Sequence, residues 1–212
     1  MNIRCLNSQV LDANCYIIKV NNYTIIIDPC ISVKELSKYG IIRVDNVLIT
    51  HAHFDHIYYL EEVYKIYKPK IFCHTNAIEK IFNDSLNLSS LFGKALNIDL
   101  DKSIFTCIKD NDCININDVT ISVLYTPGHS SCSVSYLIKS DNILFTGDTL
   151  FYRSIGRSDL YSGNSLSLSN SLKKIASLNR DYIVYPGHDR ATTIGDELKN
   201  NLMFNEMIKW FW

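Results

Sequence analysis

The most informative stretch of this chain is HAHFDH, residues 51–56. It holds three histidines and an aspartate, while the whole sequence of 212 residues contains only six histidines. The run NVLIT, residues 46–50, comes directly before it and predicts a short buried strand. Half of the histidines are therefore expected where one strand ends.

Side chains two residues apart in a strand point to the same side. His51 and His53 are therefore placed to present two imidazoles to one metal ion. Asp55 and His56 follow where the chain turns toward the next helix, so they reach a neighbouring point. This pattern predicts two adjacent metal positions. Imidazole nitrogen and carboxylate oxygen suit zinc, iron or manganese.

Three further segments share one local pattern, in which an apolar strand leads through a glycine to a ligand-type residue. The ligand-type residue is His129 in TPGHS, Asp148 in FTGDT and His188 in YPGHD. Glycine allows the sharp backbone turn that such a position needs. Five of the six histidines thus serve one hypothesis. The three strands are predicted at 118–126, 142–146 and 182–185.

Composition limits the classes of protein to consider. The chain is 47% hydrophobic and 20% charged, as expected for a globular protein, and its net charge is −1. This balance gives no electrostatic reason to expect a nucleic acid or an anionic membrane as partner. No apolar run approaches the roughly 20 residues of a membrane span, and no signal peptide is apparent.

Cysteine usage indicates the compartment. The seven cysteines are scattered, without a C-x-x-C pair. This pattern is typical of reduced thiols in a cytosol, so we expect a cytoplasmic protein. The oligomeric state stays open.

The remaining patterns indicate an α/β fold with a mixed sheet system. Two β-branched runs at 15–20 and 23–29 predict a hairpin that turns at Asn21-Asn22. The serine-rich segment near 165–178 carries leucines at helical spacing and predicts a capped helix. Further helices are predicted at 33–40, 57–67, across 76–98 and at the end of the chain, with a strand at 70–74.

The motifs HAHFDH, TPGHS, TGDTLF and PGHD, in this order, resemble the signature of the metallo-β-lactamase fold superfamily. The resemblance extends from ANCYII, residues 13–18, to TTIGDE, residues 192–197. SIGRSDL, residues 154–160, is similar to the small glyoxalase II-like (hydroxyacylglutathione hydrolase-like) branch. The resemblance implies a four-layer αββα sandwich, classed as α/β or α+β, with one domain over residues 1–212.

The resemblance also implies a ligand set and roles for its members. Asp148 would bridge two metal ions, and Asp28 would orient a ligand histidine, as carboxylates near metal-bound imidazoles do. The alternative for Asp28 is an ordinary turn aspartate before Pro29. The first ion would be held by His51, His53 and His129, and the second by Asp55, His56 and His188.

The implied reaction is thioester or ester hydrolysis of a small molecule. Two divalent ions, most simply zinc, with iron or manganese as alternatives, would supply a bridging hydroxide near neutral pH. The hydroxide would attack the substrate carbonyl, and the positive charge of an ion would stabilise the developing oxyanion. Asp148 and Asp55 are the predicted catalytic carboxylates, and Asp55 would also accept a proton.

Substrate recognition is less determined by the sequence. Arg157 resembles the position where glyoxalase II enzymes place a basic residue for glutathione, and the alternative is an ion pair with Asp159. After His188 only residues 189–212 remain, too few for the helical C-terminal region of full-length glyoxalase II. The aromatic tail at 210–212 is expected to cap the core.

Some residues depart from the family pattern. Ile57, Tyr58 and Tyr59 stand where the family usually has glycines, so they fill space beside the motif. Cys30 and Cys132 are expected close to the ligands. They could serve as extra soft ligands or redox-sensitive thiols, but we expect them to be small buried residues. His74 fits no ligand position and is expected to be structural.

Two alternative functions stay open. One is a persulfide dioxygenase-like oxidoreductase with a single iron, and the other is a metal-binding module without enzyme activity. Metal identity and oxygen dependence would separate the oxidoreductase from a hydrolase. A zinc β-lactamase of the type nearest to this motif would have cysteine in place of Asp148 and would be secreted, and both features argue against it.

Overall fold

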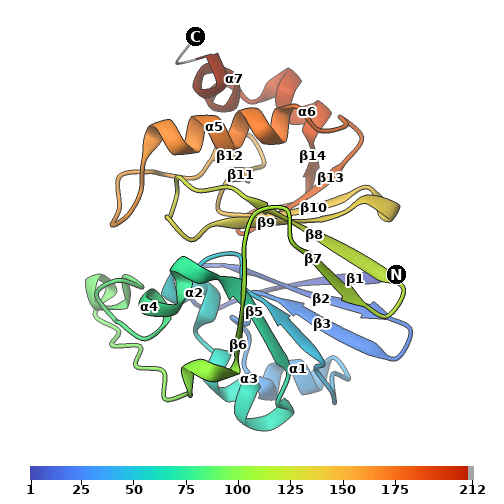
Figure 1. Ribbon diagram of the computed structural model, residues 1–212, viewed down its shortest axis with the longest axis vertical. Coiled ribbons are helices and arrows are strands. Elements are labelled where there is room, and N and C mark those ends of the chain that lie inside the picture. Colours follow the sequence, from blue (N-terminus) through green and yellow to red (C-terminus); the bar gives the residue numbers. More distant parts are fainter. Residues whose placement is uncertain (210–212) are drawn as a thin grey trace. The chain divides into compact units, whose positions relative to one another are not determined.

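The computed structural model describes residues 1–209, so the tail at 210–212, predicted to cap the core, lies outside the described residues. The chain divides into two compact units, Met1–Ile108 and Lys109–Trp212. Each unit has its own six-stranded sheet (Figure 1). The mixed α/β class is as predicted, and the assignment of one domain to residues 1–212 stays a prediction.

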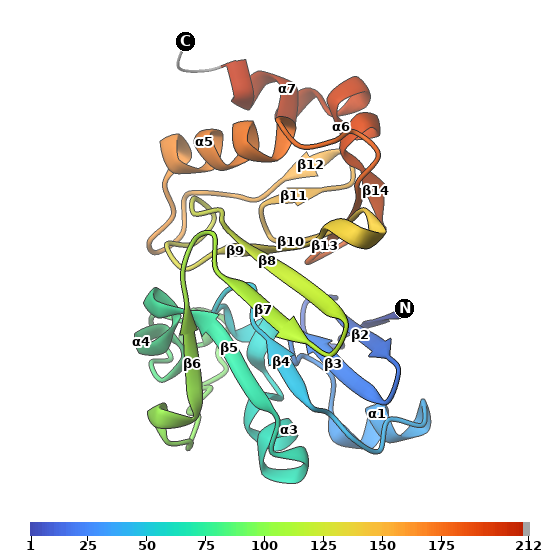
Figure 2. The same ribbon diagram turned by 45° about the vertical axis from the view of Figure 1, so that its right-hand side comes forward.

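The sheet of the first unit has the strand order β1-β2-β3-β4-β5-β6. The first three strands pair antiparallel, and β3 to β6 pair parallel (Figure 2). Parallel strands are buried on both faces, which explains the continuous apolar run of β3. The strands are β1 (Asn2–Asn7), β2 (Asn14–Val20), β3 (Tyr23–Ile27), β4 (Asn46–Leu48), β5 (Lys70–His74) and β6 (Phe105–Ile108).

The predicted hairpin is confirmed between β2 and β3. Val20 pairs with Tyr23 at its tip, and Asn21 adopts the left-handed conformation that asparagine tolerates. Ser32 caps the first helix by accepting from the Glu35 N–H. The helices of this unit are α1 (Val33–Lys38), α2 (Phe54–Ile57), α3 (Leu60–Tyr67) and α4 (Ile78–Ile81), with 3₁₀ turns η1 (Thr75–Ala77), η2 (Ser89–Phe92) and η3 (Lys102–Ile104).

The prediction of a helix across 76–98 is wrong beyond Ile81. The segment that follows α4 is held by side chains that bond to its backbone. Asn83 Oδ1 accepts from the N–H groups of Ser85 and Leu86, and Asn87 Oδ1 accepts from the Ser89 N–H. Such bonds compete with helical hydrogen bonds, so the helical spacing of apolar residues does not produce a helix here.

The sheet of the second unit has the strand order β14-β13-β10-β9-β8-β7. Only the β10–β13 pair is parallel. A short hairpin, β11 (Leu150–Phe151) and β12 (Ser154–Ile155), follows β10. The main strands are β7 (Cys113–Ile116), β8 (Val119–Tyr125), β9 (Val134–Ile138), β10 (Ile143–Gly147), β13 (Ile183–Pro186) and β14 (Thr192–Thr193), with a 3₁₀ turn η4 (Lys139–Asp141).

Three helices cover one face of this second sheet (Figures 1 and 2). They are α5 (Ser165–Ala176), α6 (Ile194–Asn200) and α7 (Leu202–Lys209). The serine-rich segment is a helix, as predicted, because Asn164 caps it and Leu168 and Leu172 enter the core. Leu144 of β10 and Phe204 of α7 belong to the same buried cluster. Across residues 1–209, no helix has the length and apolar character needed to cross a bilayer.

Candidate metal centre

The first unit carries four of the predicted ligands where its parallel strands end. Strands β3 and β4 end together, since Ile27 pairs with Leu48, and the carboxyl ends of parallel strands share one sheet edge. His53 is the N-cap residue of α2, and that helix carries Asp55 and His56. All four side chains are buried. Charged and imidazole side chains are rarely buried unless they have a partner. They are His51, His53, Asp55 and His56.

Asp28 organises this cluster from the end of β3. Its Oδ1 accepts from the Thr50 N–H at 2.7 Å, and its Oδ2 accepts from the Thr50 hydroxyl at 2.6 Å. Oδ2 also lies 2.9 Å from His56 Nδ1. Because the single Thr50 hydroxyl hydrogen goes to Asp28, the 3.1 Å contact with His51 Nδ1 requires that ring nitrogen to donate. Both rings therefore turn the lone pair of Nε2 toward the cluster, as metal binding requires.

Spacing between ligand atoms fits an ion between them. His56 Nε2 and Asp55 Oδ2 are 3.6 Å apart, which is long for a hydrogen bond. Tetrahedral metal bonds of about 2.1 Å separate two ligand atoms by about 3.4 Å. The His51 ring centroid lies 4.6 Å from that of His53 and 4.2 Å from that of His56. The three imidazoles of the HAHFDH motif thus gather around one region.

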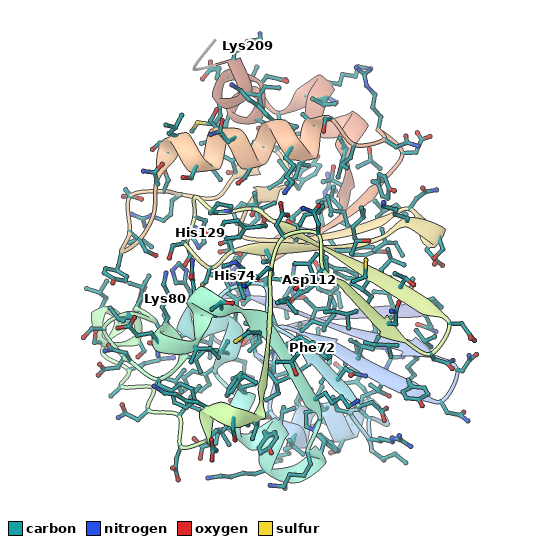
Figure 3. The ribbon with its side chains drawn as sticks, in the orientation of Figure 1. Phe72, His74, Lys80, Asp112, His129 and Lys209 are labelled. Carbon is teal, nitrogen blue, oxygen red and sulfur yellow. The ribbon has the colours of Figure 1, made fainter. Side chains whose placement is uncertain are left out.

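The second unit carries the other three predicted ligands. One oxygen of Asp148, Oδ2, lies 3.5 Å from His129 Nε2 and 3.5 Å from His188 Nε2. These distances are again those between ligands of a shared ion, and one carboxylate serves both imidazoles. His129 Nδ1 donates to the Arg157 carbonyl at 2.8 Å, which fixes its tautomer (His129 in Figure 3).

The glycines before two of these ligands have the conformations that the motifs predict. Gly128, before His129, has φ of 139°, and a Cβ there would lie 2.3 Å from the Leu168 backbone. Gly147, before Asp148, has φ of 49°. L-residues with a side chain rarely adopt such angles, so glycine lets each strand turn directly into its ligand.

Arg157 makes an ion pair within its own loop. Its guanidinium donates to both oxygens of Asp159, each at 2.7 Å, and this pairing lowers the pKa of Asp159 to about 2. The pair is the alternative that the sequence left open for this arginine. The backbone carbonyl of Arg157, not its side chain, reaches ligand His129. A substrate-binding role for the side chain stays a prediction.

Cys30, Cys132 and His74, which lie outside the predicted ligand set, have contacts or burial typical of residues that stabilise the fold. Cys30 is buried, its Sγ lies 3.5 Å from the Ala13 carbonyl, and burial raises the pKa of its thiol well above the usual value. Cys132 is also buried. His74 Nδ1 accepts from the Asn76 N–H at 3.1 Å and so caps η1 (His74 in Figure 3).

Two contributors are absent from the ligand prediction. Thr50 links Asp28 to His51, and Gly156 packs against the backbone of Asp148. Their positions beside HAHFDH and within SIGRSDL are the only signals that the sequence offers. The donor set itself, imidazole nitrogens with carboxylate oxygens held by second hydrogen bonds, fits divalent zinc, iron or manganese.

Comparison with known proteins gives concordant matches. The family profile described as "Metallo-beta-lactamase superfamily" matches residues 9–188. The probable metallo-hydrolase YqgX of Bacillus subtilis is 32% identical, over 92% of this chain and 93% of the relative. A hydroxyacylglutathione hydrolase of Francisella philomiragia is 30% identical, over 82% of this chain and 62% of the relative.

Among solved structures, BLEG-1 B3 metallo-β-lactamase is similar with a TM-score of 0.89 at 32% identity, covering 95% of this chain and 98% of that chain. This match confirms the predicted fold class. Together with the family profile over residues 9–188, it also confirms the resemblance that the ordered motifs indicated. The chain belongs to the metallo-β-lactamase superfamily.

Proposed function

We propose that this protein is a dinuclear metal-dependent hydrolase that cleaves a thioester of a small thiol carrier. Membership of the superfamily supports an enzyme with a divalent metal site. The observation that carries the dinuclear form is Asp148 Oδ2, which lies 3.5 Å from Nε2 of both His129 and His188. One oxygen so placed suits a carboxylate that bridges two ions. The proposed first ion has the ligands His51, His53 and His129, and the second has Asp55, His56 and His188.

In this proposal, different residues orient the metal-binding imidazoles and accept a proton from water. When bound, the two ions supply a hydroxide near neutral pH and positive charge for the carbonyl oxygen. Asp28 keeps His56 in the tautomer whose Nε2 binds metal, and Thr50 does the same for His51. Asp55, beside His56, is the carboxylate proposed to take the proton of the attacking water. No nucleophilic side chain of the protein is required.

A thioester is the proposed substrate because its thiolate is a good leaving group and a soft metal ligand. The 30% identical hydroxyacylglutathione hydrolase supports this choice. This chain covers 62% of that relative, so glutathione as the thiol carrier is itself a proposal. We propose a small-molecule thioester or ester, not nucleic acid or a membrane, as the partner.

Zinc is the proposed ion, with iron or manganese as alternatives, since the nitrogen and oxygen ligands suit all three. We propose the cytoplasm as the compartment. All seven cysteines are free thiols, which suits a reducing environment.

The test is hydrolysis of S-lactoylglutathione by protein loaded separately with zinc, manganese and iron. Asp148→Asn is expected to lower kcat at least about 100-fold, because the amide has one acceptor oxygen in place of a bridging carboxylate. Asp141→Asn, in the exposed turn η4, is the matched control. Turnover that survives Asp148→Asn would exclude the dinuclear mechanism.

A second candidate is hydrolysis of a β-lactam, because the similar structure BLEG-1 is a B3 metallo-β-lactamase. A chromogenic cephalosporin in the same assay decides between them. Efficient turnover of the cephalosporin with none of the thioester would replace the proposed substrate and keep the metal-dependent hydrolase.

A further inference from the structure

The segment that follows Asp148 touches all three ligand residues of the second unit. The rings of Phe151 and His188 are close to perpendicular, with centroids 5.9 Å apart. The Arg157 carbonyl accepts from His129 Nδ1 at 2.8 Å. The geometry of these ligands therefore depends on where the residues 149–157 are held.

Gly156 makes the closest of these contacts. A Cβ built at this position would lie 1.8 Å from the carbonyl oxygen of Asp148 and 3.2 Å from Cβ of His129. The Gly156 N–H also donates to the Thr149 carbonyl at 3.2 Å. The β11–β12 hairpin thus closes back directly onto two ligand residues, and a small shift of the hairpin moves both.

The tip of this hairpin needs support from outside. Arg153 has φ of 58°, a left-handed conformation that is unfavourable for a residue with a side chain. The two strands of the hairpin have two residues each, so their own pairing is short. A tip of this kind persists where surrounding groups fix it.

Glu197 of α6 supplies this support. Its side chain is fully buried, and its Oε2 accepts from the Arg153 N–H at 2.8 Å. The same oxygen accepts from Asn201 Nδ2 at 2.8 Å, and Oε1 accepts from the Thr192 hydroxyl at 2.7 Å. Asn201 Nδ2 in turn donates to the Ser154 carbonyl at 3.0 Å. Arg153 at the hairpin tip and Ser154 at the start of β12 are therefore tied to one buried carboxylate and its partner.

We propose that Glu197 is a positioning residue of the metal centre, which acts on His129, Asp148 and His188 through the β11–β12 hairpin. The inference rests on the proposed function, because it takes these three residues as ligands. The hydrogen bonds of Glu197 described above run to Arg153, Thr192 and Asn201, which are not proposed ligands. Its effect runs from the hairpin tip through Gly156 and the Arg157 carbonyl to the ligand side chains.

Two variants at this position separate hydrogen bonding from volume. Glu197→Met has a similar size and no oxygen to accept from the Arg153 N–H. Glu197→Gln keeps one oxygen for Arg153 and Asn201, and its amide group faces the Thr192 hydroxyl, which can reverse and accept. The conservative variant is therefore expected to rescue what the methionine loses.

The measurement is metal affinity by chelator competition, with the cobalt absorption spectrum as a second readout of ligand geometry. Glu197→Met is expected to weaken metal binding about 10-fold or more and to change the cobalt bands, as loss of a group that orients metal ligands does. Glu197→Gln is expected within about threefold of the parent. Asp196→Asn is the control, since that neighbouring carboxylate is partly exposed and pairs with the Arg153 guanidinium.

A role limited to stability would lower the melting temperature and leave metal affinity and the cobalt bands unchanged at a temperature where all variants are folded. That result would overturn the proposal. If Glu197→Met does not fold, Thr192→Val removes one hydrogen bond at constant shape, and Thr192→Ser retains it. Weaker binding in Thr192→Val alone supports the proposal, and equal binding in both overturns it.

Failure of the proposed function has a different signature. A parent protein that binds neither zinc nor cobalt would overturn the metal centre and this inference together. A parent that binds two equivalents, with variants that bind equally well, would overturn only the role of Glu197.

Discussion

Asp28 orients two histidines of the HAHFDH motif, His56 directly and His51 through Thr50. Its two oxygens take three donors, from the Thr50 N–H, the Thr50 hydroxyl and His56 Nδ1. Asp28→Asn leaves one acceptor oxygen and turns an amide toward donors. We therefore expect metal affinity to fall about 10- to 100-fold, measured by chelator competition.

Asp45→Asn is the matched control for this variant. Asp45 also belongs to the first unit, where its Oδ2 accepts from the Thr24 N–H at 2.9 Å. It was predicted neither to bind metal nor to orient a ligand. It is expected to alter stability and leave metal affinity within about twofold. Equal loss of affinity in both variants would contradict the specific role of Asp28.

Gly156 allows the close approach between the hairpin and Asp148. The Cβ of Gly156→Ala would lie 1.8 Å from the Asp148 carbonyl oxygen, so the backbone must move. We expect a loss of at least about 2 kcal/mol in the free energy of unfolding, measured in urea, with lower bound metal. At Gly195 the nearest such contact is 3.2 Å, so Gly195→Ala is expected to be far milder. Similar losses in the two variants would refute the argument.

At the level of single residues, the sequence reveals ligands better than the groups that orient them. His51, His53 and Asp148 are visible because imidazoles and carboxylates at strand ends are chemically specific. Thr50 and Glu197 are not, because their effect depends on which oxygen faces which donor. That information exists only once the backbone is placed.

Among the elements, those with strong local signals were predictable. The β2–β3 hairpin follows from Asn21-Asn22 between β-branched runs, and α5 follows from its capping Asn164 and its buried leucines. The short edge strands β7 and β14 were not predicted as separate strands. Their pairing depends on neighbours distant in sequence, which local patterns do not encode.

The segment 83–98 shows why helical spacing is insufficient. Asn87 is fully buried, its Oδ1 accepts from the Ser89 N–H at 3.0 Å, and its backbone carbonyl accepts from the Phe54 N–H at 2.9 Å. The segment is thus tied to α2, the helix that carries Asp55 and His56. Side-chain bonds to the backbone interrupt the helical hydrogen bonding along this stretch, which keeps only isolated turns.

The side chain of Asn87 is therefore expected to stabilise this segment. Asn87→Ala leaves the buried Ser89 N–H without its acceptor, and we expect a loss of about 1–3 kcal/mol in the free energy of unfolding in urea. Leu91→Ala, 69% exposed in the same segment, is the control and is expected within about 0.5 kcal/mol. A neutral Asn87→Ala would show that the segment is held by other contacts.

For the whole molecule, the order of motifs was the decisive signal. The superfamily is confirmed over residues 9–188, whereas composition indicated only a globular protein and the local patterns only an α/β class. The substrate does not follow from the same residues, because metal ions held by this ligand set would activate water in the same way for many substrates. Specificity depends on surfaces that carry no fixed motif.

The distribution of cysteines gives a prediction for the molecule as a whole. Cys107 and Cys113 are exposed, so both are expected to react rapidly with a thiol reagent in the native protein. Cys5 is also exposed as a residue, but burial of its thiol raises the pKa of that thiol to about 11. It is therefore expected to react at least about tenfold more slowly than Cys107 and Cys113. The other four are buried and should react only on unfolding: Cys15, Cys30, Cys73 and Cys132.

The count of thiols also tests the expected reducing compartment. Without reductant, all seven thiols should react in denaturant, because all seven are free in the folded chain. In the native protein, two of them should react fast and one slowly. Cys107→Ser should remove one fast thiol and leave the slow phase unchanged. Five thiols after unfolding would reveal a disulfide and contradict the reduced state. Rapid reaction of a fourth thiol in the native protein would show that a buried part of the chain opens easily.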